Sequence, residues 1–218
     1  EIKKEENAGD CYNDSCESLI TELRLSSKDS YNPNRFEKAI RAAFDFIGYD
    51  ATWLVGSGKT DVLIKARTAP KLSYAVAVDA KSTQSGNVTE DQIDFDTLKD
   101  HRKLHHADYS AIVGCSFRGE RLLNRCKEHK VALIDVDTLE QLIRNQVEIP
   151  LTGEDYKKIF EQTGIVDISV LDEARNRTER YGLLVDAIVG CLVNESKDEV
   201  TEGILTSREI YRTVRDDE

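Results

Sequence analysis

The chain has 218 residues, of which 39% are hydrophobic and 33% are charged, and its formal net charge is −11. This length suits one domain with its own core, or one domain with a small appendage. No apolar stretch approaches the roughly 18–20 residues that cross a membrane, and the polar, acidic beginning is unlike a signal peptide. Five cysteines, an odd number without a tight framework, favour a reduced, cytoplasmic protein. Because the sequence contains no Met, we expect a segment of a longer protein.

Charge is distributed unevenly along the chain. Residues 59–130 carry 13 Lys and Arg against 10 Asp and Glu, whereas the flanks carry 17 basic and 31 acidic residues. The middle of the chain is therefore its electropositive part. A polyanion such as nucleic acid could be held there, with additional affinity supplied by another domain.

The start of the chain predicts a linker and two helices. Residues 1–14 are polar and are expected to form the linker, and apolar positions predict a helix over residues 15–26. Asn34 can cap a second helix over residues 35–47, which Gly48 ends. The apolar side chains of this second helix share one face, as packing against a sheet requires.

Beyond Gly48, strands and helices alternate. Runs rich in β-branched residues predict strands, and amphipathic runs predict helices. The predicted strands are residues 51–55, 61–66, 72–79, 109–115 and 131–135, and the predicted helices are residues 90–105, 120–129 and 138–145. Residues 151–218 look helical, with a Thr- or Ser-capped helix over 206–214. This order predicts an α/β fold, a mixed β-sheet flanked by helices, with a helical C-terminal extension.

The stretch Gly56-Ser57-Gly58-Lys59-Thr60 suggests a phosphate-binding loop and hence a nucleotide hydrolase. Such a loop needs Gly-x4-Gly-Lys-Ser/Thr between a strand and a helix, but Trp53 occupies the position of the first Gly. The residues after Thr60, Asp61-Val62-Leu63-Ile64, are typical of a strand and not of a helix. We therefore predict that residues 56–59 form a hairpin turn. Trp53 is interpreted as a core residue, with stacking on a nucleic-acid base as the alternative.

Two carboxylates and a lysine stand at the ends of predicted strands. Asp79 and Lys81 are two residues apart, so both project to the same face of an extended strand. If the strand that begins at Asp61 pairs with this one, Asp61 comes beside Asp79. Two converging carboxylates with a lysine make a site for a hard divalent cation and a water molecule. On these residues alone, an ordinary surface pair of Asp79 and Lys81 is the alternative.

Asp61 followed by Asp79-Ala80-Lys81 resembles the PD-(D/E)xK nuclease signature, with Thr60 where that signature usually has Pro. The neighbouring sequence resembles the FokI-type cleavage domains of type IIS restriction endonucleases. The segments that carry this likeness are residues 44–49, 54–64, 74–81 and 91–94, within a span of about 35–145. The resemblance implies a restriction-endonuclease-like sheet. The domains would be an N-terminal linker and helix (1–30), a nuclease core (31–148) and a helical extension (149–218).

The resemblance also implies a catalytic site. Asp61 and Asp79, with the backbone carbonyl of Ala80, would bind Mg²⁺ (or Mn²⁺), which neutralises charge on the scissile phosphate and activates water. Lys81 would orient the attacking water or help to deprotonate it. Glu37 is placed where related nucleases often keep an acidic residue, and a solvent-exposed position without function is the alternative.

Further residues are expected to support the site or to contact double-stranded DNA. Gln92 resembles a polar supporting residue on the helix behind the site. The candidate DNA contacts are Lys59, Ser82, Arg118 and Arg121. Residues 92–98 lack the arginine that supports dimerisation in the FokI-type domains, so at most a transient dimer is expected.

The whole protein is expected to be a Mg²⁺-dependent DNA endonuclease of the prokaryotic cytoplasm, with a recognition domain or subunit outside this segment and no membrane association. An inactive nuclease-fold scaffold or DNA-binding module is the alternative.

Overall fold

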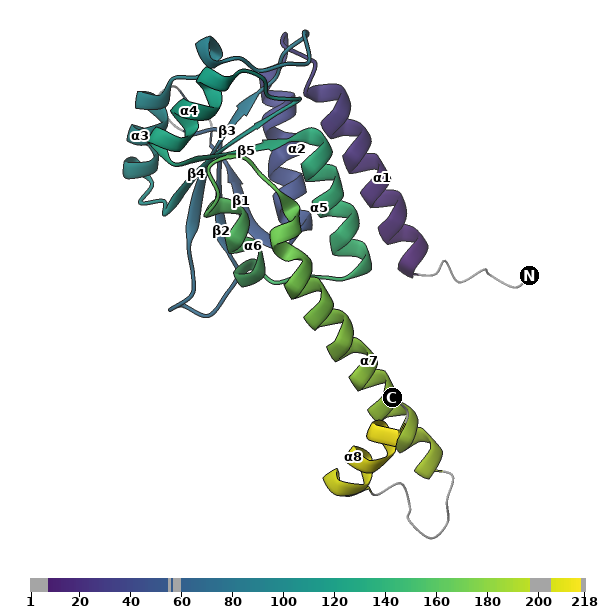
Figure 1. The fold of residues 1–218 in the computed structure, drawn as a ribbon. Coiled ribbons are helices and arrows are strands. Elements are labelled where there is room, and N and C mark those ends of the chain that lie inside the picture. Colours follow the sequence, from purple (N-terminus) through teal and green to yellow (C-terminus); the bar gives the residue numbers. More distant parts are fainter. Residues whose placement is uncertain (1–7, 55, 57–59, 197–204, 217–218) are drawn as a thin grey trace, which may run out of the picture. The chain divides into compact units, whose positions relative to one another are not determined.

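The computed structural model describes residues 8–54, 56, 60–196 and 205–216 (Figure 1). The chain divides into two compact units, residues 1–172 and 173–218. The first unit contains a six-stranded sheet with strands in the order β1-β2-β3-β4-β5-β6. The predicted class, a mixed sheet flanked by helices, is confirmed.

Two helices precede the sheet. Helix α1 (Ala8–Ser26) begins well before residue 15, so part of the segment predicted as a linker is helical. Helix α2 (Pro33–Phe46) begins at Pro33, whose fixed φ suits the first helical turn. Its N-cap is therefore Asn32, and the prediction of Asn34 as the cap was wrong.

The first three strands form an antiparallel meander. Strand β1 (Tyr49–Trp53) pairs with β2 (Val62–Ala66), and β2 pairs with β3 (Ala75–Lys81). The Leu54 N–H donates to the Asp61 carbonyl over 2.9 Å, which extends the first hairpin beyond its last paired residues. The predicted turn at 56–59 lies outside the described residues except for Gly56, whose φ of +127° suits a residue without a Cβ.

The second half of the sheet is parallel. Strands β4 (Tyr109–Gly114), β5 (Val131–Asp135) and β6 (Gly164–Ile165) follow β3 in that order. The connecting helices are α3 (Phe95–Leu104), α4 (Glu120–His129), α5 (Val136–Glu148) and α6 (Gly153–Phe160). Short 3-10 turns lie at Glu90–Gln92 (η1) and Ile168–Leu171 (η2). The predicted helix 90–105 is therefore broken at Ile93, after which Asp94 caps α3 through its side chain.

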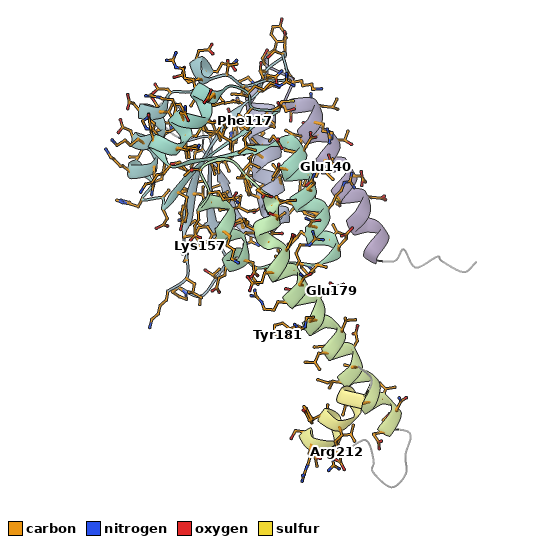
Figure 2. The ribbon with its side chains drawn as sticks, in the orientation of Figure 1. Phe117, Glu140, Lys157, Glu179, Tyr181 and Arg212 are labelled. Atoms are coloured by element: carbon orange, nitrogen blue, oxygen red, sulfur yellow. The ribbon has the colours of Figure 1, made fainter. Side chains whose placement is uncertain are left out.

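Helices cover both faces of the sheet. Figure 1 shows α3 and α4 on one side, and α2 and α5 on the other with α1 outside them. Glu140 of α5, labelled in Figure 2, forms ion pairs with Arg24 of α1 (2.5 Å) and with Arg144 of its own helix (2.9 Å). Core strand residues such as Val76, Val78 and Ile112 are fully buried, as expected for a sheet covered on both sides.

The compact unit continues to residue 172, well past the predicted core boundary at 148. Helix α6 and strand β6 join the core after that boundary. Tyr49 donates from its hydroxyl to the Tyr74 hydroxyl (2.6 Å), and Tyr74 donates to the Gly153 carbonyl at the start of α6 (2.6 Å). The ring of Phe160 on α6 packs edge-on against Tyr49, with ring centroids 6.0 Å apart. These buried contacts tie α6 to the sheet.

Removing the Tyr74 hydroxyl tests whether this connection stabilises the first unit. Tyr74→Phe leaves the Gly153 carbonyl and the Tyr49 hydroxyl without these partners, so we expect the free energy of unfolding to fall by about 1–3 kcal/mol. Urea unfolding followed by the fluorescence of Trp53, the only Trp of the chain, would measure the change in this unit. Tyr31→Phe is the matched control, because Tyr31 is 88% exposed. Equal stability of the two variants would contradict the expectation.

The second unit contains two described helices, α7 (Asp172–Glu195), which begins at the boundary, and α8 (Ser207–Asp216). Thr206 caps α8: Glu209 accepts from the Thr206 N–H (2.8 Å) and from its hydroxyl (2.6 Å). The predicted Thr-capped helix is thus confirmed. Tyr181 of α7, labelled in Figure 2, is 61% exposed. No described helix is long and apolar enough to cross a membrane.

Candidate active site

Register places the two acidic residues of the motif side by side. In the β2–β3 pair Val62 lies opposite Val78, so the next position of each strand brings Asp61 opposite Asp79. Because side chains alternate along a strand, Asp79 and Lys81 share the face of the sheet that also carries Asp61. Ile112, the β4 partner of Asp79, packs in the core cluster with Phe95 and Leu98 of α3. The carboxylates therefore lie on the α3 and α4 side of the sheet.

Two hydrogen bonds fix the start of β2 against the end of β3. The Asp61 carboxylate accepts from the Ala80 N–H over 2.7 Å. The fully buried Thr60 donates from its hydroxyl to the Val78 carbonyl over 2.9 Å. Thr60 occupies the position where the nuclease signature usually has Pro, and here its side chain adds a bond that Pro cannot make. The two strand ends are thus held together by side-chain hydrogen bonds as well as by the backbone hydrogen bonds between β2 and β3.

Lys81 pairs with Asp79 at the end of β3. Its Nζ lies 2.8 Å from Asp79 Oδ2, and the side chains of Lys81 and Asp79 are 30% and 14% exposed. Asp79 Oδ2 is buried and accepts no hydrogen bond of good geometry within the described residues, so the ammonium is its close electrostatic partner. A buried carboxylate oxygen with this little hydrogen bonding is costly for a structural residue.

The charge of Asp61 is strongly perturbed. The pKa of Asp61 is raised to about 7, mainly by burial and next by the negative charge of Asp79. The hydrogen bond from Ala80 opposes this rise, Glu37 adds to it, and Lys81 opposes it. A carboxyl group whose pKa is raised by burial and by a neighbouring carboxylate is typical of a functional site.

Glu37 lies on α2, which covers the opposite face of the sheet (Figure 1). Its Oε2 accepts from the Trp53 indole N–H over 2.7 Å. Lys38, the next residue, places its ammonium 4.5 Å from the centre of the Trp53 ring. Trp53 is half-buried, so it lies at the margin of the core. The sequence signal for this contact was weak: a Trp at a strand end needs a hydrogen-bond acceptor, and Glu37 lies 16 positions away.

The other predicted residues form no printed contact with the carboxylate pair or lie outside the described residues. Gln92 is exposed and accepts from the Thr89 N–H (2.9 Å), which caps η1. Arg121 is paired with Glu90 (3.3 Å). The remaining candidates are Arg118, which is exposed before α4, Ser82, which is half-buried after Lys81, and Lys59, which lies outside the described residues.

These outer residues nevertheless start from the same edge of the sheet. Strands β3 and β4 are parallel, with Lys81 opposite Gly114, so the segments that follow them leave the sheet together. Val88 in the first segment forms a parallel bridge with Phe117 in the second. The segments carrying Ser82 and Arg118 are therefore neighbours at the edge where the carboxylates lie.

The acidic pair fits a divalent cation. Among the described residues Asp79 Oδ2 accepts no hydrogen bond of good geometry, and the Asp79 charge raises the pKa of Asp61, a repulsion that a cation would relieve. Ala80 brings a peptide group beside them. Among the residues that the structure describes, no three His, Cys, Asp or Glu side chains converge as a metal cluster. Glu37 is thus not part of a three-carboxylate cluster with the pair.

Comparisons with known proteins relate this chain to restriction endonucleases. The family model described as "Restriction endonuclease" matches residues 28–143. A type II restriction enzyme, HgaI from Avibacterium volantium, is 30% identical over 130 residues, which cover 59% of this chain and 25% of that enzyme. The chain thus spans about a quarter of the length of this curated relative.

Two solved structures share the fold. The restriction endonuclease FokI aligns with a TM-score of 0.57 and 18% identity, over 72% of this chain and 34% of FokI. FokI bound to DNA aligns with a TM-score of 0.55 and 18% identity, over 77% of this chain and 34% of FokI. The likeness to these two structures concerns the sheet and its helices.

Proposed function

Because the chain belongs to the restriction endonuclease family, matched over residues 28–143, we propose that it is the cleavage domain of a larger restriction or defence enzyme. It hydrolyses phosphodiester bonds of double-stranded DNA with the help of Mg²⁺ or Mn²⁺. The observation that carries this proposal is the antiparallel register that sets Asp61 opposite Asp79, with Lys81 on the same face.

Each residue of the site has a distinct proposed role. Asp61 and Asp79, with the peptide group of Ala80, hold the cation, which when bound offsets phosphate charge and acidifies water. Lys81 is kept 2.8 Å from Asp79, and from there its ammonium orients the attacking water and offsets charge developing on the phosphate. Glu37 adds negative charge on the α2 side. Cleavage leaves a 5′-phosphate and a 3′-hydroxyl.

The contacts to DNA are proposed around this site. Ser82 and Arg118 leave the sheet at the carboxylate edge, and Arg121 lies in the first turn of α4. Lys59 precedes Asp61 by two positions in the sequence. The three basic side chains and the Ser82 hydroxyl would hold phosphates and orient the duplex without reading its sequence. Gln92 supports this edge by capping η1.

A separate recognition domain or subunit, outside the 218 residues, is proposed to select the DNA sequence. The chain covers only 25% of HgaI and 34% of FokI, which leaves room for such a part in the relatives. A transient dimer would place two cleavage sites on one duplex. We place the protein in the prokaryotic cytoplasm, where the free thiols of Cys16, Cys115, Cys126 and Cys191 are stable.

Incubation of the 218-residue chain with supercoiled plasmid tests the proposal. With Mg²⁺ or Mn²⁺ we expect nicked and then linear DNA, and with EDTA none, because the two carboxylates need a cation between them and the phosphate. The chain is used at high concentration, since it lacks its recognition part. DNA binding in a gel shift without cleavage under any divalent metal would favour the inactive scaffold instead.

A further inference from the structure

The peptide groups at the start of β2 alternate in direction. The Asp61 carbonyl accepts from the Leu54 N–H over 2.9 Å and therefore points toward β1. Because hydrogen-bonding directions alternate along an antiparallel strand, this alternation assigns the peptide groups of Val62 and Thr60 to the side of β3. Val62 is paired there with Val78, but β2 begins at Val62 and the pairing extends no further. Thr60 thus lies just outside the backbone pairing of the two strands.

Two side-chain hydrogen bonds take the place of the next backbone pair. A continued pairing would join Thr60 to Ala80, but the described residues show no backbone hydrogen bond between them. The Ala80 N–H donates instead to Asp61 Oδ2 over 2.7 Å. The hydroxyl of the fully buried Thr60 donates to the Val78 carbonyl over 2.9 Å. Side chains therefore fix the Asp61 carboxylate at the point where backbone pairing ends.

The Thr60 bond acts on both acidic residues through the backbone. Thr60 immediately precedes Asp61 in the chain. Its acceptor, Val78, immediately precedes Asp79. Without this bond the start of β2 would be free to move away from the end of β3, and the Asp61 carboxylate would be free to leave the Ala80 N–H. The position of one carboxylate relative to the other thus depends on the Thr60 hydroxyl.

We propose that Thr60 is a positioning residue of the metal site: its hydroxyl holds β2 against β3 so that the Asp61 carboxylate stays on the Ala80 N–H, beside Asp79. This inference rests on the proposed function. The bond from Ala80 engages Oδ2 of Asp61 and leaves Oδ1 of that carboxylate for a cation. Residues that orient metal ligands affect metal affinity although they do not touch the metal.

Mn²⁺ affinity, measured by isothermal calorimetry on the 218-residue chain, tests the inference. Thr60→Val removes the hydroxyl and keeps the shape of the side chain, so we expect Mn²⁺ binding to weaken about tenfold. Thr60→Ser keeps a hydroxyl donor, so its affinity should lie within about threefold of the native value.

Tyr74→Phe is the matched control for a general loss of stability. It also removes buried hydrogen bonds from the first unit, but Tyr74 precedes β3, whereas Asp79 lies near the other end of that strand. Its Mn²⁺ affinity should therefore differ from the native value by less than about twofold.

Hydrogen exchange at the Ala80 amide gives a second readout that needs no metal. In EDTA we expect this amide to exchange at least about tenfold faster in Thr60→Val than in the native chain, and at a near-native rate in Thr60→Ser. The Val78 amide is the internal reference, because it stays within the backbone pairing and a general loss of stability would accelerate both amides alike.

The outcomes distinguish the inference from the proposed function. Native Mn²⁺ affinity in Thr60→Val, or an equal loss of affinity in Thr60→Ser, would overturn the inference alone. An equal loss in Tyr74→Phe would also overturn it, because general destabilisation would then explain the effect. Mn²⁺ binding that is absent from the native chain, or that survives Asp79→Asn, would overturn the proposed function and the inference with it.

Discussion

Asp79→Asn is expected to lower the rate of plasmid cleavage at least about a thousandfold. The change keeps the shape of the side chain but removes one of the two charges that would hold the cation. It also leaves the Lys81 ammonium, 2.8 Å from Asp79 Oδ2 in the native chain, without its counterion. Lys81 would then be free to leave the position from which it acts on water. The initial rate of supercoiled plasmid loss with Mg²⁺ measures the effect.

The matched control for this variant is Asp50→Asn. Asp50 lies on β1 at the end away from the site, and its side chain is exposed. Its replacement should change the cleavage rate by less than about twofold, because surface substitutions away from a site have small effects. Circular dichroism should show the same secondary structure for both variants. Cleavage by Asp79→Asn at a rate near that of the control would remove Asp79 from the mechanism.

Asp61→Asn should make the metal-free protein more stable while abolishing cleavage. In EDTA at about pH 8, we expect the free energy of unfolding to rise by about 1–3 kcal/mol relative to the native chain. The amide introduced by this change cannot ionise beside Asp79, but its oxygen can still accept from the Ala80 N–H, a 2.7 Å bond in the native chain. Urea unfolding followed by Trp53 fluorescence gives the comparison.

The pH dependence of the free energy of unfolding shows whether ionisation of Asp61 causes this difference in stability. The pKa of Asp61 is about 7 in the folded chain against 3.8 for an ordinary Asp, so the folded state binds more protons between these values. Native stability therefore falls as pH rises through this window and levels off above about pH 7, and the advantage of the Asp61→Asn variant grows over the same range. At about pH 4 the two proteins should be nearly equally stable. A variant less stable than the native chain at high pH would contradict repulsion between the two carboxylates.

Much of the sheet could be predicted from the sequence because its strands are buried runs of β-branched and small residues. The segment that ends in Asp79 and Lys81 has the apolar pattern of a buried strand, and these two charged residues depart from that pattern. One stretch of sequence therefore indicated both a strand of the fold and the candidate site. The apparent phosphate loop was rejected because a strand follows Thr60, and β2 confirms that strand. Local sequence patterns were sufficient to predict a strand wherever that strand is buried on both faces.

Other features depend on tertiary contacts that local patterns do not encode. Strand β6 has only two residues, one of them Gly164, which is too short for a strand pattern in the sequence. It is defined by its pairing with β5. The break at Ile93 follows from competition between two caps, in which Gln92 is used by η1 and Asp94 starts α3. The hydrogen bond between Trp53 and Glu37 joins a strand end to a helix, and no periodicity relates those positions.

The pairing of β2 with β3 carries an implication for how the two carboxylates vary among relatives. Asp61 and Asp79 meet because of hydrogen-bond register, and not because of the number of residues that connect β2 to β3. An insertion in this connection can therefore lengthen the gap between the two acids without separating them in space. A slip of the pairing by one residue would instead turn Asp61 to the opposite face of the sheet. A search for distant relatives should accordingly let the number of residues between the acids vary and hold fixed the strand phase in which each one stands.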